Sequence, residues 1–160
     1  MFTLKKVEPL LKETYIAVIN NSVGSVMFRN SFARIEGKKV DINTDGKTAC
    51  SFHVSSTLMM FGEHGLIKTP HGVTASTVLD MEYCGWVKIK TPKIGAVLIW
   101  EEKFGNGEAN EHCGFYVGKQ MAVSNSPKIR KVIKHHWTYG GTAQQPSRKV
   151  TAIYWHAKLD

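Results

Sequence analysis

The sequence has few cysteines, no long apolar run and no low-complexity segment. Its three cysteines are an odd number and include no C-x-x-C pair, which argues against a disulfide framework. The segments "EHC" and "KHHW" match no known zinc-ligand spacing, so we expect neither a metal nor an organic cofactor. No segment approaches the roughly 18 consecutive apolar residues of a membrane span, and we expect no such span.

The N-terminal segment also lacks the apolar core of a secretory signal, because charges at Lys5, Lys6, Glu8, Lys12 and Glu13 interrupt it. We therefore expect either a cytoplasmic location or export by a route that leaves no such signal. No repeat or linker divides the 160 residues, which are enough to bury a core without disulfides. The sequence predicts one domain over residues 1–160.

Basic residues exceed acidic ones, and the formal net charge is +8. The densest basic stretch is "SPKIRKVIKHH". Such a surface suits a polyanionic partner, either a nucleic acid or an anionic cell-wall polymer. A basic protein with no polyanionic partner has the same composition, so charge alone does not choose among these.

The periodicity of apolar residues changes along the chain. A helical stripe runs from Val7 to Ile19, and two further helices are predicted from about Ala49 to Phe61 and from Thr74 to Tyr83. Short β-rich segments separated by Gly, Asn or Pro follow. Helices first and strands afterwards predict an α+β fold, with N-terminal helices packed on an antiparallel sheet.

Cys50 stands where the second predicted helix begins, just after the turn "NTDGKT". A helix N-terminus stabilises a thiolate and lowers the pKa of the thiol, which makes the cysteine a better nucleophile. A free cysteine is also among the most buried residue types and is then usually inert. Cys50 is therefore a candidate nucleophile, with core packing as the alternative.

The other two cysteines lack this setting. Cys84 falls at a predicted helix end, where the helix dipole disfavours a thiolate. Cys113 follows a histidine in a predicted strand, so the two side chains point to opposite faces. We expect Cys84 and Cys113 to be packing residues.

His112 lies in the strand-like segment "HCGFYVG". Alternation places His112 and Gly114 on one face of the strand and Cys113 and Phe115 on the other. Because Gly114 has no side chain, we expect open space beside His112, as a substrate channel requires. These features make His112 the candidate general base.

A general base needs a third group that fixes its tautomer, and the next strand, "AVSNS", offers Ser124 and Asn125. A three-residue turn over 118–120 places Ser124 on the His112 face, whereas a two-residue turn over 119–120 places Asn125 there. Lys-Gln is a poor two-residue turn, which favours Ser124. Asn is chemically the better orienter, so both residues stay candidates.

The remaining histidines carry weaker signals. His53 lies one helical turn beyond Cys50 and can reach it, and either His135 or His136 can line a cleft, because they alternate in a strand beside Trp137. His64, His71 and His156 have no distinguishing context. Structural roles are favoured for all of them.

Three segments together resemble a known family. The segments "CSFHVSS", "GAVLIW" and "HCGFYVG" resemble three motifs of the NlpC-type cell-wall peptidases and the related CHAP amidohydrolases, which have papain-like folds. In those families the motifs are the helix that carries the nucleophile, the strand that precedes the histidine and the strand that carries the histidine. The three segments occur here in the same order and at plausible spacing. The resemblance covers Thr44 to Asn125, about half of the chain. Ala49 and Ala96 replace the aspartates that are usual in that pattern.

The resemblance implies that Cys50 is the nucleophile, that His112 is the base and that the polar orienter falls on Ser124, where His, Asn or Glu is more common. It also implies a papain-like fold and hydrolysis of amide bonds in peptidoglycan, as an endopeptidase or an N-acetylmuramoyl-L-alanine amidase. No metal or cofactor is needed for that chemistry.

Two other functions fit the residues. A papain-like domain can act on another amide substrate as an effector toxin, which an inhibitor protein would then restrain. Alternatively, a basic module can bind nucleic acid or wall polymer through aromatic side chains interleaved with Lys and Arg, and the cysteine would be inert. Because core packing explains the aromatics of "KHHWTYG" and "IYWHAKL" equally well, a nucleic acid is not the favoured partner.

Overall fold

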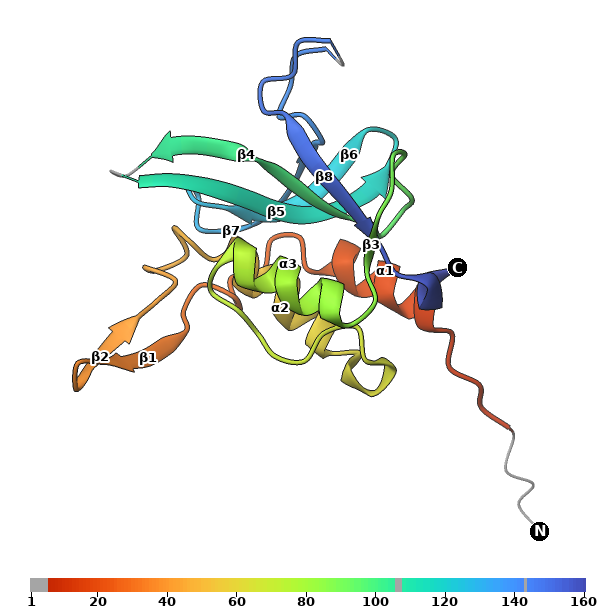
Figure 1. Ribbon diagram of the computed structural model, residues 1–160, viewed down its shortest axis with the longest axis horizontal. Helices are drawn as coiled ribbons and strands as arrows, with labels where there is room; N and C mark the ends of the chain where they lie inside the picture. Colours follow the sequence, from red (N-terminus) through yellow and green to blue (C-terminus); the bar gives the residue numbers. More distant parts are fainter. Residues whose placement is uncertain (1–5, 106–107, 143) are drawn as a thin grey trace.

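The computed structural model describes residues 6–105, 108–142 and 144–160. Within these ranges the chain forms α-helices, short 3-10 helices and β-strands (Figure 1). The helices are α1 (Leu11–Asn21), α2 (Cys50–Met59), η1 (Gly62–His64), α3 (Thr74–Tyr83) and η2 (Ala157–Leu159). The strands are β1 (Phe32–Ile35), β2 (Lys38–Asp41), β3 (Val87–Lys88), β4 (Val97–Gly105), β5 (Glu108–Gly118), β6 (Met121–Ser126), β7 (Lys131–His136) and β8 (Val150–Trp155).

Helices α1, α2 and α3 lie on one side of the main sheet, as Figure 1 shows. The strand order in this sheet is β3-β8-β4-β5-β6-β7, and every described pair of neighbours is antiparallel. The α+β class and the antiparallel sheet predicted from the sequence are thereby confirmed. None of the helices in the described ranges is long and apolar enough to cross a membrane.

The core lies between the helices and the sheet. Tyr15 of α1 packs edge-on against Phe115 of β5, and its hydroxyl donates to the carbonyl oxygen of Gly95 at 2.7 Å. Val54 and Leu58 of α2 are fully buried in the same cluster. Phe115 therefore faces the helices, on the side of β5 that alternation placed opposite His112.

The hairpin of β1 and β2 was not predicted from the sequence. It projects away from the main sheet (Figure 1) and turns through Glu36 and Gly37, both at positive φ. Its apolar residues do not enter the core, since Phe32 and Ile35 are exposed. A segment whose apolar side chains stay in solvent shows no regular burial pattern, which is why alternation did not reveal it.

The turn between β5 and β6 differs from the favoured expectation. It has two residues, Lys119 and Gln120, both with the positive φ that a tight hairpin turn requires. Tyr116 pairs with Ala122 and Gly118 pairs with Met121, so Val117 is an extra residue that forms a bulge. The bulge shifts the pairing of β6 by one residue, so Ser124 lies on the same face as His112 although the turn is short.

The expectation of open space beside Gly114 is wrong. A side chain added there would meet the carbonyl oxygen of Val123 at 2.5 Å, Cβ of Ser124 at 2.7 Å and the ring of Trp100 at 3.2 Å. Gly114 is needed because β6 and Trp100 approach the strand closely, not because a channel passes.

We expect Gly114→Ala to lower the free energy of unfolding by about 2 kcal/mol or more, because two of these contacts involve backbone or Cβ atoms that cannot move aside. Urea unfolding measures the change. The matched control is Gly62→Ala, whose new Cβ would meet only the flexible end of Met59 at 3.8 Å and should change the value by less than about 0.5 kcal/mol. Equal stabilities for the two variants would contradict this account of the packing.

Candidate active site

Cys50 is the first residue of α2, where the sequence placed it. No side chain caps this helix, because Ala49 occupies the N-cap position. The first intrahelical hydrogen bond runs from the amide of His53 to the carbonyl of Ala49, so the amides of Cys50, Ser51 and Phe52 point out of the helix end. These amides and the helix dipole favour negative charge at this end.

The thiol of Cys50 lies beside two consecutive residues of β5. In the described structure the pairing of β5 with β6 ends at Phe115 and Val123, before Cys113 is reached. The backbone amide of Cys113 there becomes a donor to the sulfur of Cys50. The sulfur of Cys50 is thus close enough for both Cys113 and His112 to influence its charge, although their side chains leave opposite faces of the strand.

These contacts hold the pKa of Cys50 well below its ordinary value. The largest cause is a hydrogen bond from the Cys113 side chain, and the charge and hydrogen bond of His112 add to it, while burial acts in the opposite direction. The pKa of Cys113 is raised well above normal by its bond to Cys50 and by burial. The negative charge therefore resides on Cys50, which is partly exposed, and not on Cys113, which is fully buried.

His112 is 5% exposed and lies between Cys50 and Ser124. Its Nε2 lies 3.0 Å from the hydroxyl of Ser124, which leaves Nδ1 as the ring nitrogen available to the thiol. The ring of Trp100 packs against the imidazole with centroids 5.4 Å apart. The structure therefore brings together Cys50, His112 and Ser124.

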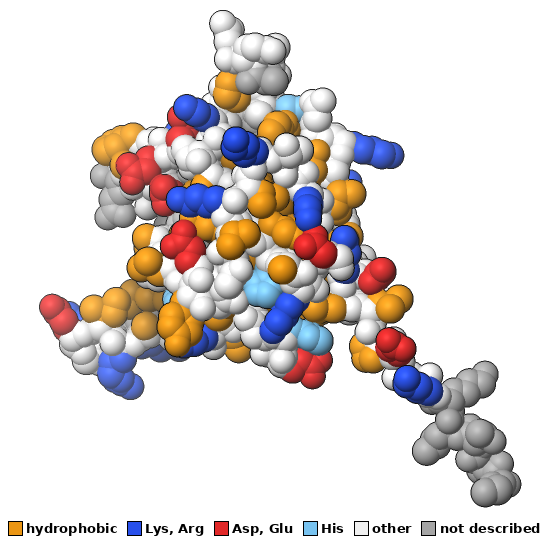
Figure 2. Space-filling view, turned by 45° about the vertical axis from the view of Figure 1, so that its right-hand side comes forward, with side chains coloured by type: hydrophobic (Ala, Val, Ile, Leu, Met, Phe, Trp, Pro, Cys, Tyr) orange, Lys and Arg blue, Asp and Glu red, His pale blue; other side chains and the backbone are white. Residues whose placement is uncertain are grey.

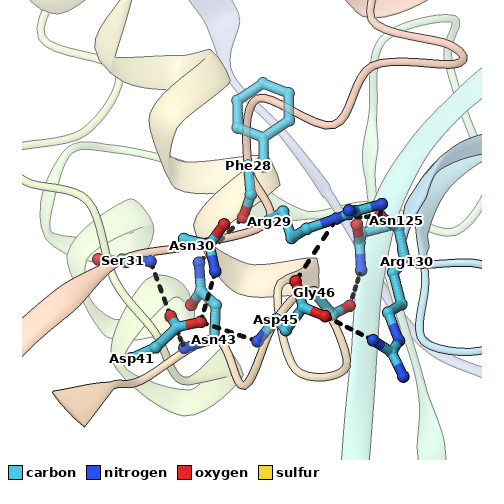
Figure 3. Close-up of polar contacts among 10 residues, drawn as sticks. All are labelled: Phe28, Arg29, Asn30, Ser31, Asp41, Asn43, Asp45, Gly46, Asn125 and Arg130. Carbon is cyan, nitrogen blue, oxygen red and sulfur yellow. Dashed lines mark hydrogen bonds and ion pairs between the residues drawn. The ribbon is translucent and has the colours of Figure 1, made fainter.

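Asn125, the alternative orienter, lies on the opposite face of β6. Its side-chain amide donates to the carbonyl oxygen of Gly46 at 2.8 Å, on the loop that precedes Cys50 (Figure 3). It is 2% exposed. In the described structure Asn125 therefore fixes the approach to α2 and makes no hydrogen bond to His112.

The loop over residues 41–49 is also fixed from other directions (Figure 3). The carboxylate of Asp41 accepts hydrogen bonds from the amides of Ser31, Asn43 and Asp45 and from the side chain of Asn30. Burial is the largest single influence and raises the pKa of Asp41, but the four hydrogen bonds together outweigh it and lower the pKa below its ordinary value.

Two arginines hold the next carboxylate of this loop. Asp45 pairs with Arg130 at 2.5 Å and with Arg29 at 3.8 Å, and Arg29 also donates to the carbonyl oxygen of Arg130. These contacts join the loop to the segment between β6 and β7. The position of Cys50 thus depends on ordinary ion pairs and turn hydrogen bonds some residues before it.

A cavity of about 620 Å³ opens beside Cys50 and His112. Its wall includes the start of α3 and, from β4 and β5, both acidic and basic side chains. The charged residues that line it are Lys47, Glu102, Lys103, Glu111 and Arg148. A substrate of mixed polarity can therefore reach the thiol. No group of three or more His, Cys, Asp or Glu side chains in the described ranges is arranged to hold a metal ion.

Two further residues belong to this site: Tyr139, which the sequence did not indicate, and His135, which it did not distinguish from His136. His135 of β7 and Tyr139, in the turn after it, both contact the hydroxyl of Ser124, at 2.8 and 3.1 Å. Alternation had indicated only that His135 or His136 can line a cleft. The stacking of His135 on Tyr139, with ring centroids 4.1 Å apart, depends on a turn that no local pattern marks.

His53 has the structural role that was expected from the sequence. It is fully buried, its Nε2 lies 3.2 Å from the hydroxyl of Ser22, and its ring meets Phe28 and Phe115 edge-on. Burial lowers its pKa to about 3, so the ring stays neutral near pH 7.

In comparisons with known proteins, no family model and no curated protein matches the sequence.

We expect iodoacetamide near pH 7 to label Cys50 faster than Cys84 and Cys113. A lowered pKa leaves more Cys50 as thiolate at this pH, whereas burial and Asp80 raise the pKa of Cys84, and Cys113 is sealed from solvent. Peptide mass spectrometry measures the three rates. In urea the three thiols should react alike, and equal rates in the folded protein would contradict an activated Cys50.

We expect Asn125→Ala to destabilise the fold by about 1–3 kcal/mol, because the buried carbonyl of Gly46 loses its donor. Urea unfolding measures the loss, with Asn20→Ala as the control, since that exposed amide bonds only to its own helix at Ile16. Unchanged stability together with a large loss of Cys50 reactivity would instead make Asn125 the orienter.

Proposed function

We propose that this protein is a cysteine hydrolase with a papain-like site that cleaves amide bonds through a thioester intermediate. The observation that supports it most is the sequence of contacts from the Cys50 thiol to His112 and on to Ser124, at the edge of an open cavity. A nucleophile within reach of a base, with the base held by a third group, is the arrangement that acyl transfer by cysteine requires.

In the acylation step Nδ1 of His112 takes the proton of the Cys50 thiol, and the resulting thiolate attacks the carbonyl carbon and forms a C–S bond. The outward-pointing backbone amide of Cys50 stabilises the resulting oxyanion. His112 then donates its Nδ1 proton to the leaving nitrogen as the C–N bond breaks. An amine leaves, and the acyl group remains on the sulfur as a thioester.

In the deacylation step His112 acts as a base. Its Nδ1 takes a proton from water, whose oxygen attacks the thioester carbonyl, and the C–S bond breaks to release a carboxylic acid and the thiolate. Ser124 accepts a hydrogen bond from Nε2 throughout, and this stabilises the imidazolium that forms in both steps. No other reactant is needed.

The substrate we propose is peptidoglycan, cleaved within its stem peptide or between the stem peptide and the glycan. This choice follows the resemblance of "CSFHVSS", "GAVLIW" and "HCGFYVG" to cell-wall peptidases and amidases. The net charge of +8 suits an anionic wall. On the face seen in Figure 2, Lys and Arg side chains are interspersed with apolar side chains and carboxylates, which suits a diffuse polyanion better than one defined groove.

We expect purified peptidoglycan to be cleaved by the wild-type protein, with the rate lowered at least about a thousandfold in Cys50→Ala and in His112→Ala. Mass spectrometry of the released fragments gives the rate and identifies the bond that is cut. Circular dichroism confirms that the variants fold. The control is Cys84→Ala, which removes a thiol far along the chain from the site and should retain full activity.

Binding of peptidoglycan without any cleavage, and with no faster labelling of Cys50, would favour a binding module instead. Cleavage of a protein or small amide, but not of peptidoglycan, would preserve the chemistry and reject the substrate.

A further inference from the structure

The hydroxyl of Ser124 meets three polar groups. It lies 3.0 Å from Nε2 of His112, 2.8 Å from Nε2 of His135 and 3.1 Å from the hydroxyl of Tyr139. Ser124 is fully buried. A hydroxyl has one hydrogen to donate and two lone pairs that accept, so one of the three neighbours receives its hydrogen and the other two donate to it.

His135 determines which neighbour receives the hydrogen. Its Nδ1 lies 2.8 Å from the carbonyl oxygen of His136, and because a carbonyl only accepts, this nitrogen carries a hydrogen. Burial lowers the pKa of His135 to about 4, so the ring is neutral near pH 7 and its Nε2 has only a lone pair. Ser124 therefore donates to His135.

The hydrogen of Ser124 is then not available to His112. Nε2 of His112 must itself carry a hydrogen and donate it to Ser124, which in the neutral ring leaves Nδ1 bare on the side of Cys50, where it can take the proton of the thiol. Tyr139 fills the second lone pair of Ser124, because burial raises its pKa and keeps its phenol protonated. Every donor and acceptor around the hydroxyl is satisfied in this one arrangement.

We propose that His135 is a positioning residue: by accepting the hydrogen of Ser124, it fixes His112 in the tautomer whose bare Nδ1 faces Cys50. A base that carries its hydrogen on Nδ1 cannot take a proton from the thiol or from water at that position. Because it acts through His112, this role rests on the proposed hydrolase chemistry, but the tautomer itself can be measured without any substrate.

The contacts of His135 allow its hydrogen bond to be removed with little change in packing. The ring stacks on Tyr139 at an interplanar angle of 25° and lies 5.7 Å from the ring of Trp100. His135→Phe keeps a ring in this place and removes the acceptor. His135→Gln is the conservative variant, because its side-chain oxygen can accept from Ser124.

The first experiment is ¹⁵N NMR of the imidazole nitrogens at about pH 8, where a histidine is ordinarily neutral. It uses the Cys50→Ser background, which removes the thiolate so that the two neutral tautomers of His112 are compared. We expect the hydrogen of His112 on Nε2 and that of His135 on Nδ1, and with His135→Phe added we expect part of His112 to shift to the Nδ1–H form. A His112 with its hydrogen on Nδ1 before that change would overturn the proposal.

The second experiment measures the rate of peptidoglycan cleavage in single and double variants. We expect His135→Phe to lower the rate roughly five- to tenfold, because the free energy of one hydrogen bond changes the ratio of the two tautomers by about that factor. His135→Gln should restore most of the lost rate. In a Ser124→Ala background His135→Phe should have no further effect, because its influence passes through Ser124. The control His64→Phe makes the same substitution at a histidine of η1 whose ring pairs with Glu63, outside the site, and it should change the rate less than about twofold.

Additive effects of Ser124→Ala and His135→Phe would overturn the proposal, as would equal rates for His135→Phe and the wild type. If no amide substrate is cleaved but the tautomers are as expected, the proposed function fails and the role of His135 in orienting His112 stands. If cleavage is normal and the tautomers are reversed, the proposed function stands and this inference fails.

Discussion

The arrangement of the site depends on the hydrogen bonds that meet at the sulfur of Cys50. They join the helical layer to the sheet beyond the last pair of β5 with β6, where the amide of Cys113 faces the sulfur. A helix start alone lowers a thiol pKa modestly. Here the sulfur also receives an amide, a thiol and an imidazole, and this combination sets Cys50 apart from the other two cysteines.

The rest of the site is built outward from that contact. Ion pairs and turn hydrogen bonds fix the loop before Cys50, and the close approach permitted by Gly114 brings Ser124 against His112. Aromatic rings of Trp100 and Tyr139 surround the imidazole and keep water from its Nε2 side. A buried polar cluster that is fully satisfied specifies one geometry, and the proposed role of His112 as a base requires such a geometry.

Local patterns in the sequence were enough to predict several elements of the fold and the position of Cys50. The helix over 74–83, the start of α2 at Cys50 and the two faces of β5 follow from periodicity and from Gly as a stop signal, and the structure has each of them. What the sequence did not reveal depends on pairings between distant segments. The bulge at Val117 and the placement of His135 are set by how β6 and β7 dock, and Gly114 was misjudged because its neighbours come from β4 and β6.

The bulge at Val117 decides which residue of β6 stands beside the imidazole. If Val117 instead paired with Ala122 across the same two-residue turn, each residue of β6 beyond Met121 would move by one partner and exchange faces. Asn125 would then stand opposite Gly114, and Ser124 would turn toward the loop at Gly46. Deletion of Val117 has no such effect, because Gly118 would still pair with Met121 and Tyr116 with Ala122. A slip of one residue in this hairpin is thus enough to interchange a serine and an asparagine beside the imidazole, with no substitution at either position.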